Sequence, residues 1–132
     1  MLASAHSFTP QLHPDYVPRL YALICDGKCM EPIYKDGQTL IFSKAEPWRA
    51  GDVVAVYRRP GSVPLGENPV LLKVLSSAPP PSFFQSEARR GDAYRSKLIV
   101  RMLNPPRSIV LNAEDVLGIH KCLGPLNEEE EL

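Results

Sequence analysis

The sequence predicts a mainly β fold built from a mostly antiparallel sheet. Short runs rich in Val, Ile and Leu recur along the chain and are separated by Gly, Pro, Asn and Asp, a pattern typical of strands joined by turns. No window carries a sustained apolar stripe with the 3.6-residue period of a helix. The fourteen prolines are too many for long helices, because proline interrupts the helical hydrogen-bond ladder.

The first expected strand covers residues 21–24 and ends where Asp26 and Gly27 break the apolar run. A short helical turn is then expected at Cys29-Met30-Glu31-Pro32. The remaining strands are expected at residues 39–42, 52–58, 70–75, 98–103, 108–111 and 116–122. Residues 76–97, with the aromatic side chains of Phe83 and Phe84 at the tip, read as a long loop or hairpin extension. The expected strands are therefore short and joined by proline-rich connections.

Length and charge narrow the class of protein. A chain of 132 residues fits one domain, which we expect at residues 21–124 between an N-terminal arm (1–20) and an acidic tail (125–132). Fifteen basic and fifteen acidic side chains cancel, so no overall charge favours nucleic acid or an anionic membrane. The sequence has no long apolar span and no signal-peptide pattern. We expect a soluble, cytoplasmic protein without a cofactor, whose three cysteines stay as free thiols.

Six short motifs occur in a fixed order along most of the chain. They are Gly27-Lys28-Cys29-Met30-Glu31-Pro32, Asp36-Gly37, Gly51-Asp52-Val53-Val54, Leu71-Leu72-Lys73-Val74-Leu75, Leu103-Asn104-Pro105 and Val116-Leu117-Gly118-Ile119. This ordered set resembles the S24 peptidases, the family of LexA-type and phage repressors and of UmuD-type proteins, and more distantly the signal peptidases. The resemblance extends over about residues 21–123.

The resemblance implies a coiled, antiparallel half-barrel of the LexA and signal-peptidase type with short helical turns. It places Cys29 at the position of the family's serine nucleophile and Lys73 at that of the general base. The backbone N–H groups of Cys29 and Met30 would hold the oxyanion. A cysteine eases the chemistry, since a thiol passes its proton to a neighbouring amine more readily than a hydroxyl does.

The residues by themselves leave other interpretations open. Cys29 could be a small buried hydrophobe, because cysteine is among the most often buried residues. Strict alternation along the strand would turn Lys73 toward solvent while Leu72 and Val74 face the core. A zinc site could be composed of Cys25, Cys29, His120 and Cys122, although the spacing does not match the common C-x2-C pattern.

Substrate and partner are expected to differ from those of self-cleaving family members, which cut at a small residue followed by glycine. Residues 1–26 contain no glycine, so the usual cleavage bond is not expected there, and we also expect no helix-turn-helix DNA-binding domain ahead of the module. Two functions follow: a peptidase that cleaves another bond, or a catalytically inactive dimerisation or peptide-binding regulatory module of the same fold. The expected partner is a peptide segment or protein, with a homodimer possible and without direct nucleic-acid binding.

Overall fold

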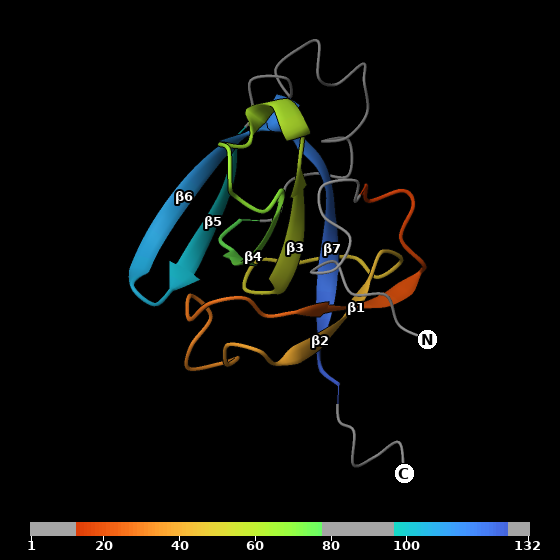
Figure 1. The fold of residues 1–132 in the computed structure, drawn as a ribbon, viewed down its shortest axis with the longest axis vertical. Coiled ribbons are helices and arrows are strands. Elements are labelled where there is room, and N and C mark those ends of the chain that lie inside the picture. Colours follow the sequence, from red (N-terminus) through yellow and green to blue (C-terminus); the bar gives the residue numbers. More distant parts are fainter. Residues whose placement is uncertain (1–12, 78–96, 127–132) are drawn as a thin grey trace.

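A computed structural model describes residues 13–77 and 97–126, and this part of the chain forms one seven-stranded antiparallel sheet (Figure 1). The strands are β1 (Leu20–Ile24), β2 (Thr39–Ser43), β3 (Val53–Arg58), β4 (Val70–Leu75), β5 (Lys97–Leu103), β6 (Pro106–Asn112) and β7 (Val116–Pro125). Their order across the sheet is β1-β2-β7-β3-β4-β5-β6. The described helical elements are two single turns, η2 (Pro60–Ser62) and η5 (Ala113–Asp115). The prediction of a mainly antiparallel β fold is confirmed.

The expected strands match the observed ones, with differences at their ends. The largest differences are in β6 and β7, which extend beyond the apolar runs. Pro106 stays in β6 because it is in register with Leu103 of β5, and Pro125 stays in β7 because it is in register with Leu40 of β2. Strand pairing thus lengthens both strands past the residues that favour strands by themselves. The expected long loop at 76–97 and the acidic tail lie almost entirely outside the described residues.

The short helical turn expected at residues 29–32 is found as a single turn that does not continue into a helix. The chain makes a run of turns there, held by a bond from the Glu31 N–H to the Lys28 carbonyl (3.1 Å) and one from the Tyr34 N–H to the Met30 carbonyl (3.0 Å). Pro32 has no N–H group, so it cannot continue a helical ladder. Any oxyanion site here would therefore use individual backbone amides and not the N-terminus of a helix.

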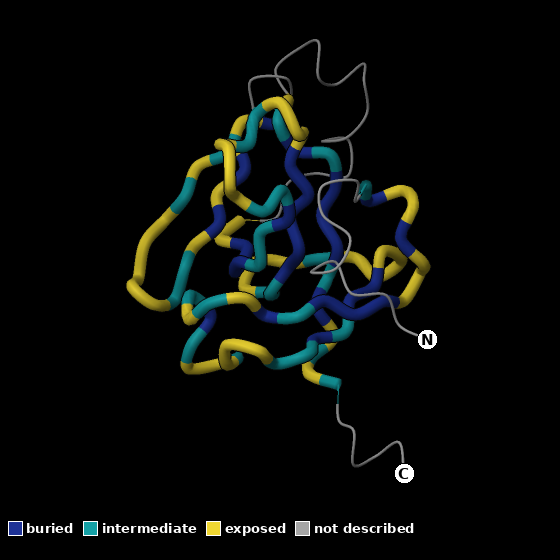
Figure 2. Tube along the Cα trace, viewed as in Figure 1, coloured by how far each residue is buried: buried dark blue, intermediate teal, exposed yellow. Residues whose placement is uncertain are grey.

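Two apolar cores lie on opposite faces of the central strands. Along β3, Ala55 and Tyr57 belong to one core, whereas Val54 and Val56 belong to the other. The buried segments in Figure 2 accordingly run down the middle of the molecule, through β3 and β7. A central strand in this sheet is therefore covered on both faces, as in sheets with near-continuous apolar strands.

Half of the outer edge of β4 is left without a strand partner in the described chain. On its inner side β4 pairs with β3 from Val70 to Val74, but β5 is in register with it only at Val74 and Leu75. Beyond that point β5 and β6 leave β4 as a two-stranded ribbon (Figure 1). The turn segment after β1 approaches this edge, and the candidate site lies between them.

Candidate functional site

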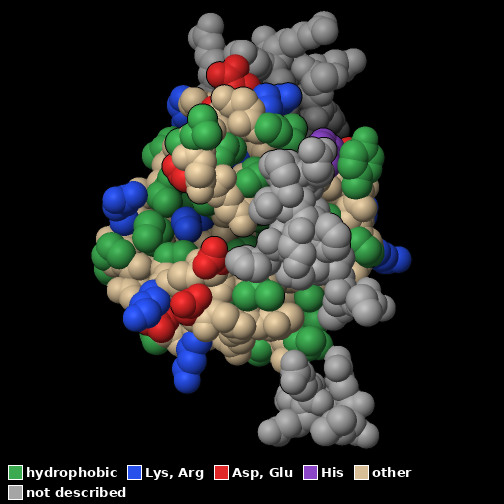
Figure 3. All heavy atoms as spheres, viewed as in Figure 1, with side chains coloured by type: hydrophobic (Ala, Val, Ile, Leu, Met, Phe, Trp, Pro, Cys, Tyr) green, Lys and Arg blue, Asp and Glu red, His purple; other side chains and the backbone are tan. Residues whose placement is uncertain are grey.

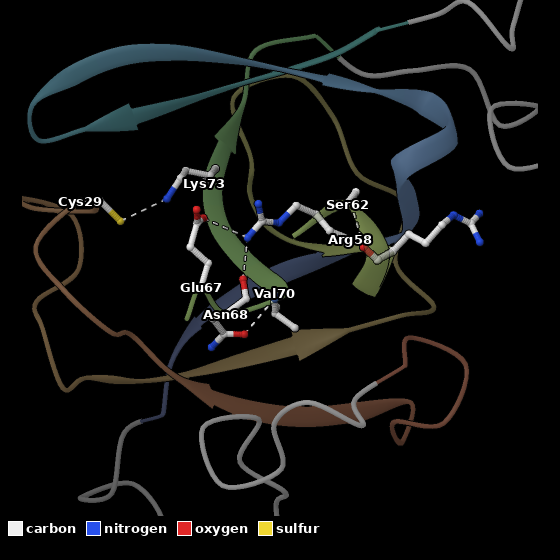
Figure 4. A network of polar contacts seen from close by, with 8 residues as sticks. Cys29, Arg58, Ser62, Glu67, Asn68, Val70 and Lys73 are labelled. Atoms are coloured by element: carbon white, nitrogen blue, oxygen red, sulfur yellow. Dashed lines mark hydrogen bonds and ion pairs between the residues drawn. The ribbon is translucent and has the colours of Figure 1, made fainter. Parts of the chain in front are cut away.

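Cys29 and Lys73, which are 44 residues apart in the sequence, lie side by side in the fold. The Lys73 Nζ donates a hydrogen bond to the Cys29 Sγ at 3.5 Å (Figure 4). Lys73 is only 8% exposed, whereas Cys29 is half-buried. The interpretation in which Lys73 faces solvent is therefore wrong, because the second face of β4 is covered as well.

The backbone around Cys29 is held from two directions. On one side, the Gly27 N–H donates to the Asp36 Oδ1 at 2.8 Å, with Gly27 at a φ of 95° that favours glycine. On the other side, the Cys29 carbonyl accepts bonds from the N–H groups of Leu103 (2.9 Å) and Asn104 (3.1 Å). The position of Cys29 is thus fixed between the β1–β2 connection and the end of β5.

A groove runs past this pair, between the end of β1 and the free half of the β4 edge. Its lining residues are Leu23, Ile24, Cys25, Asp26, Cys29, Glu67, Asn68, Val70, Leu71, Leu72 and Lys73. Figure 3 shows a face of the molecule on which apolar and charged side chains are interspersed. A thiol, a buried amine and a strand edge therefore meet in one groove.

The other two cysteines have environments that favour the neutral thiol. Burial, with a smaller contribution from the nearby Cys29, raises the pKa of Cys25 to about 11. Burial also raises the pKa of Cys122, whose Sγ lies 3.9 Å from the Tyr34 hydroxyl oxygen. At neutral pH both are poor nucleophiles, because the thiolate is the reactive form.

The alternative zinc set is not assembled. The described residues contain no group of three or more His, Cys, Asp and Glu side chains that could hold a metal ion. The His120 Nδ1 instead lies 2.6 Å from the Tyr21 hydroxyl, which accepts a bond from the Tyr57 hydroxyl at 2.6 Å. Burial lowers the pKa of His120 to about 4, so this chain of polar groups is uncharged at neutral pH.

The predicted oxyanion donors are the backbone amides of Cys29 and Met30. Across the described residues, neither amide donates a backbone hydrogen bond. Cys29 is half-buried beside the groove, whereas Met30 is fully buried in the apolar core. Their role at an oxyanion stays a prediction.

No sequence pattern indicates Arg58 and Asn68, although Asn68 lines the groove and Arg58 holds this part of its wall in place. Arg58 is 8% exposed and its Nη2 donates to the Asn68 carbonyl at 2.6 Å and to Glu67 at 3.5 Å (Figure 4). The Asn68 Oδ1 in turn accepts the Val70 N–H at 2.9 Å. An arginine at the end of an apolar strand carries no sequence signal for such a role.

Comparison with known proteins gives one informative similarity. No family model matches the chain, and no solved structure matches it. The chain is 29% identical over 107 residues to repressor protein C of Rhizobium phage 16-3. The matched region covers 81% of this chain but 35% of the repressor, so the chain spans about a third of that relative's length.

The similarity to a phage repressor agrees with the kind of protein that the six sequence motifs indicate. It supports a relationship to repressors of the phage and LexA type. Membership of the S24 peptidases and the LexA-type coil of the sheet stay predictions. The described residues also contain no helix that is long and apolar enough to cross a membrane.

Proposed function

We propose that this chain is an S24-like peptidase domain of a repressor-type protein, with Cys29 as nucleophile and Lys73 as general base. The observation that carries this proposal is the 3.5 Å contact between the Lys73 Nζ and the Cys29 Sγ, made by a lysine that is only 8% exposed. At this distance the Lys73 amine can take the thiol proton directly, without an intervening water. The relative that is a phage repressor supports the same class of protein.

The proposed reaction has two steps. Lys73 accepts the thiol proton of Cys29, the sulfur attacks the peptide carbonyl carbon, and the tetrahedral intermediate holds its negative charge on the carbonyl oxygen. Lys73 then gives the proton to the leaving amine as the C–N bond breaks, which leaves a thioester on Cys29. Water hydrolyses this thioester, with Lys73 accepting a proton from the attacking water.

The substrate would bind as an extended segment along the free half of the β4 edge. The Arg58 N–H donates to the Pro69 carbonyl and the Leu75 N–H donates to the Asp52 carbonyl, so the odd-numbered residues of β4 turn their backbone groups toward β3. The backbone groups of Leu72 therefore face the groove, where its carbonyl oxygen lies 4.0 Å from the Cys29 Sγ. A peptide paired with Leu72 by strand addition would bring its own carbonyl close to the nucleophile.

The same free edge supports a second candidate function, a catalytically inactive module that holds a peptide or pairs with a second copy. Strand addition requires backbone groups and side-chain pockets, but it requires no nucleophile. In both cases we propose a cytoplasmic protein whose partner is a peptide segment or another protein. We propose that this chain binds neither nucleic acid nor a membrane directly.

The test is incubation of the protein with a peptide pool obtained by digesting a denatured bacterial proteome, with new N-termini identified by mass spectrometry. The peptidase proposal predicts new termini with the wild type and with Cys29→Ser, which restores the hydroxyl found in the family, and none with Cys29→Ala. Termini that persist in Cys29→Ala would come from a contaminating protease. No termini with any variant, together with saturable retention of peptides, would favour the inactive module.

A further inference from the structure

Two cysteines line the groove, and the proposed peptidase reaction uses only one of them. Cys25 and Cys29 are both groove residues, four positions apart on either side of Gly27. The Cys25 Sγ lies 4.0 Å from the Gly27 carbonyl oxygen, so it is directed toward the turn that leads to Cys29. Cys122 is in a different setting, on β7 with its sulfur against Tyr34. The pair of Cys25 and Cys29 is therefore a candidate for sulfur chemistry within the groove.

The two thiols differ in the way that a redox pair requires. Cys29 is half-buried and touches the Lys73 amine, which as an ammonium would stabilise a thiolate. Cys25 is 1% exposed and its pKa is raised to about 11, so it reacts poorly with a reagent from solution. Redox-sensing cysteines are accessible thiolates that lie next to a second, resolving cysteine.

We propose that the pair of Cys25 and Cys29 is a peroxide-sensitive modification site, which closes to a disulfide and removes Cys29 from Lys73. The Cys29 thiolate attacks one oxygen of hydrogen peroxide, the O–O bond breaks, and hydroxide leaves to give a sulfenic acid. The Cys25 sulfur then attacks the Cys29 sulfur, the S–O bond breaks, and water leaves with the Cys25 proton. Overall, two thiols lose two electrons and one peroxide is reduced to two waters.

The local backbone indicates how the bond would form. The Cys25 N–H donates to the Gln38 carbonyl at 2.8 Å and the Cys25 carbonyl accepts the Gly37 N–H at 2.7 Å. Cys29 is held through its own carbonyl by Leu103 and Asn104. With both backbones anchored, the sulfur atoms must approach by rotation of the side chains, and the intervening residues 26–28 are a turn without strand pairing. Rotation of the Cys29 side chain toward Cys25 would break its contact with Lys73.

The sequence allows a direct test, because trypsin separates all three cysteines. Cleavage after Arg19, Lys28, Lys35 and Lys121 places them in peptides 20–28, 29–35 and 122–132. The folded wild type is treated with stoichiometric hydrogen peroxide, blocked with an alkylating reagent and digested without reductant. We expect a species in which peptide 20–28 is joined to peptide 29–35, about 2 Da below their sum, and its loss on reduction.

Matched variants separate this proposal from its alternatives. Cys122→Ser should form the same species. Cys25→Ser, treated with at least two equivalents of peroxide because a sulfinic acid consumes two, should instead gain about 32 Da at Cys29, because no resolving thiol is present. Joining of peptide 29–35 to peptide 122–132 would overturn the proposal. Two other results would also overturn it. The first is a product that joins Cys29 to Lys73 about 14 Da above the sum of their peptides, the mass of an N–O–S bridge. The second is equal oxidation of Cys29 in wild type and Cys25→Ser.

This proposal rests on the reactive thiol of Cys29 and not on peptide cleavage. If the protein forms the disulfide but cleaves nothing, the modification site stands and the peptidase proposal fails. If the protein cleaves peptides and Cys29 oxidises without joining Cys25, the reverse holds.

Discussion

Replacing Lys73 by methionine should slow the alkylation of Cys29 at neutral pH. Methionine keeps an apolar stem of similar length and removes the amine, so the change tests the charge and not the packing. The contact to be removed joins the Lys73 Nζ and the Cys29 Sγ at 3.5 Å. An adjacent ammonium stabilises the thiolate, which is the form that iodoacetamide attacks.

The size of the effect follows from the geometry. Two unit charges about 4 Å apart attract by about 1 kcal/mol in water and by about 4 kcal/mol at the edge of a protein. Because Cys29 is half-buried, we take the attraction between the two charges to be about 1 to 3 kcal/mol. A difference of about 1.4 kcal/mol changes the thiolate population tenfold. A thiolate of higher pKa is also a stronger nucleophile, and this offsets about half of the decrease in the logarithm of the alkylation rate. The rate should therefore fall about threefold to tenfold.

The assay follows iodoacetamide incorporation into the Cys29 peptide from about pH 6 to 9, a range that includes the ordinary thiol titration. Lys35→Met is the matched control, because it removes an exposed lysine from the same connection between β1 and β2. If the rate profiles of wild type and Lys73→Met superimpose, the two side chains do not communicate. The reasoning for a dyad then fails, and the inactive module becomes the better account.

Three further predictions concern the other thiols, the buried histidine and one glycine. In the folded protein Cys29 should be alkylated faster than Cys25 and Cys122, whose pKa values are raised by burial; equal labelling in the three tryptic peptides would contradict this order. The pKa of His120 is about 4 in the folded protein, below the ordinary 6.5. Between these two pH values the unfolded chain binds one more proton than the folded protein does, so the free energy of unfolding falls as the pH falls. In chemical denaturation the free energy of unfolding of His120→Gln should fall less steeply with pH than that of the wild type, by about 1 kcal/mol per pH unit. An unchanged dependence on pH would refute the assignment. Gly118→Ala would place a methyl group 2.8 Å from the Pro14 Cβ and should cost about 1 to 3 kcal/mol, whereas Gly61→Ala, with open space around it, should cost much less in the same denaturation experiment.

The strands could be predicted from the sequence because their apolar runs are short and are bounded by turn residues. The positions of Cys29 and Lys73 could be proposed only through the ordered motifs, since no spacing rule joins residues that are 44 positions apart. The burial of Lys73 could not be predicted. Alternation along β4 assumes that one face of the strand meets water, whereas in the fold both faces are covered by residues distant in the sequence.

The residues that hold the groove wall also could not be predicted from the sequence. Arg58 reaches across to the Asn68 carbonyl only because β3 and β4 pair as a hairpin and bring positions 58 and 69 together. The free edge of β4 depends in the same way on how far β5 pairs with it, which no local pattern encodes. Such features arise from tertiary contacts, so sequence patterns give the elements but not the site that the elements form.

We propose that Cys29 and Lys73 carry out acyl transfer together, and p-nitrophenyl acetate tests this without knowledge of the natural substrate. The measurement combines release of p-nitrophenolate with the intact mass of the protein during the reaction. We expect an acetyl thioester of about 42 Da on Cys29 that turns over in the wild type, no adduct at this position in Cys29→Ala, and slower acylation without turnover in Lys73→Met. An acetyl group found only on lysines, or turnover that is equal in wild type and Cys29→Ala, would contradict it.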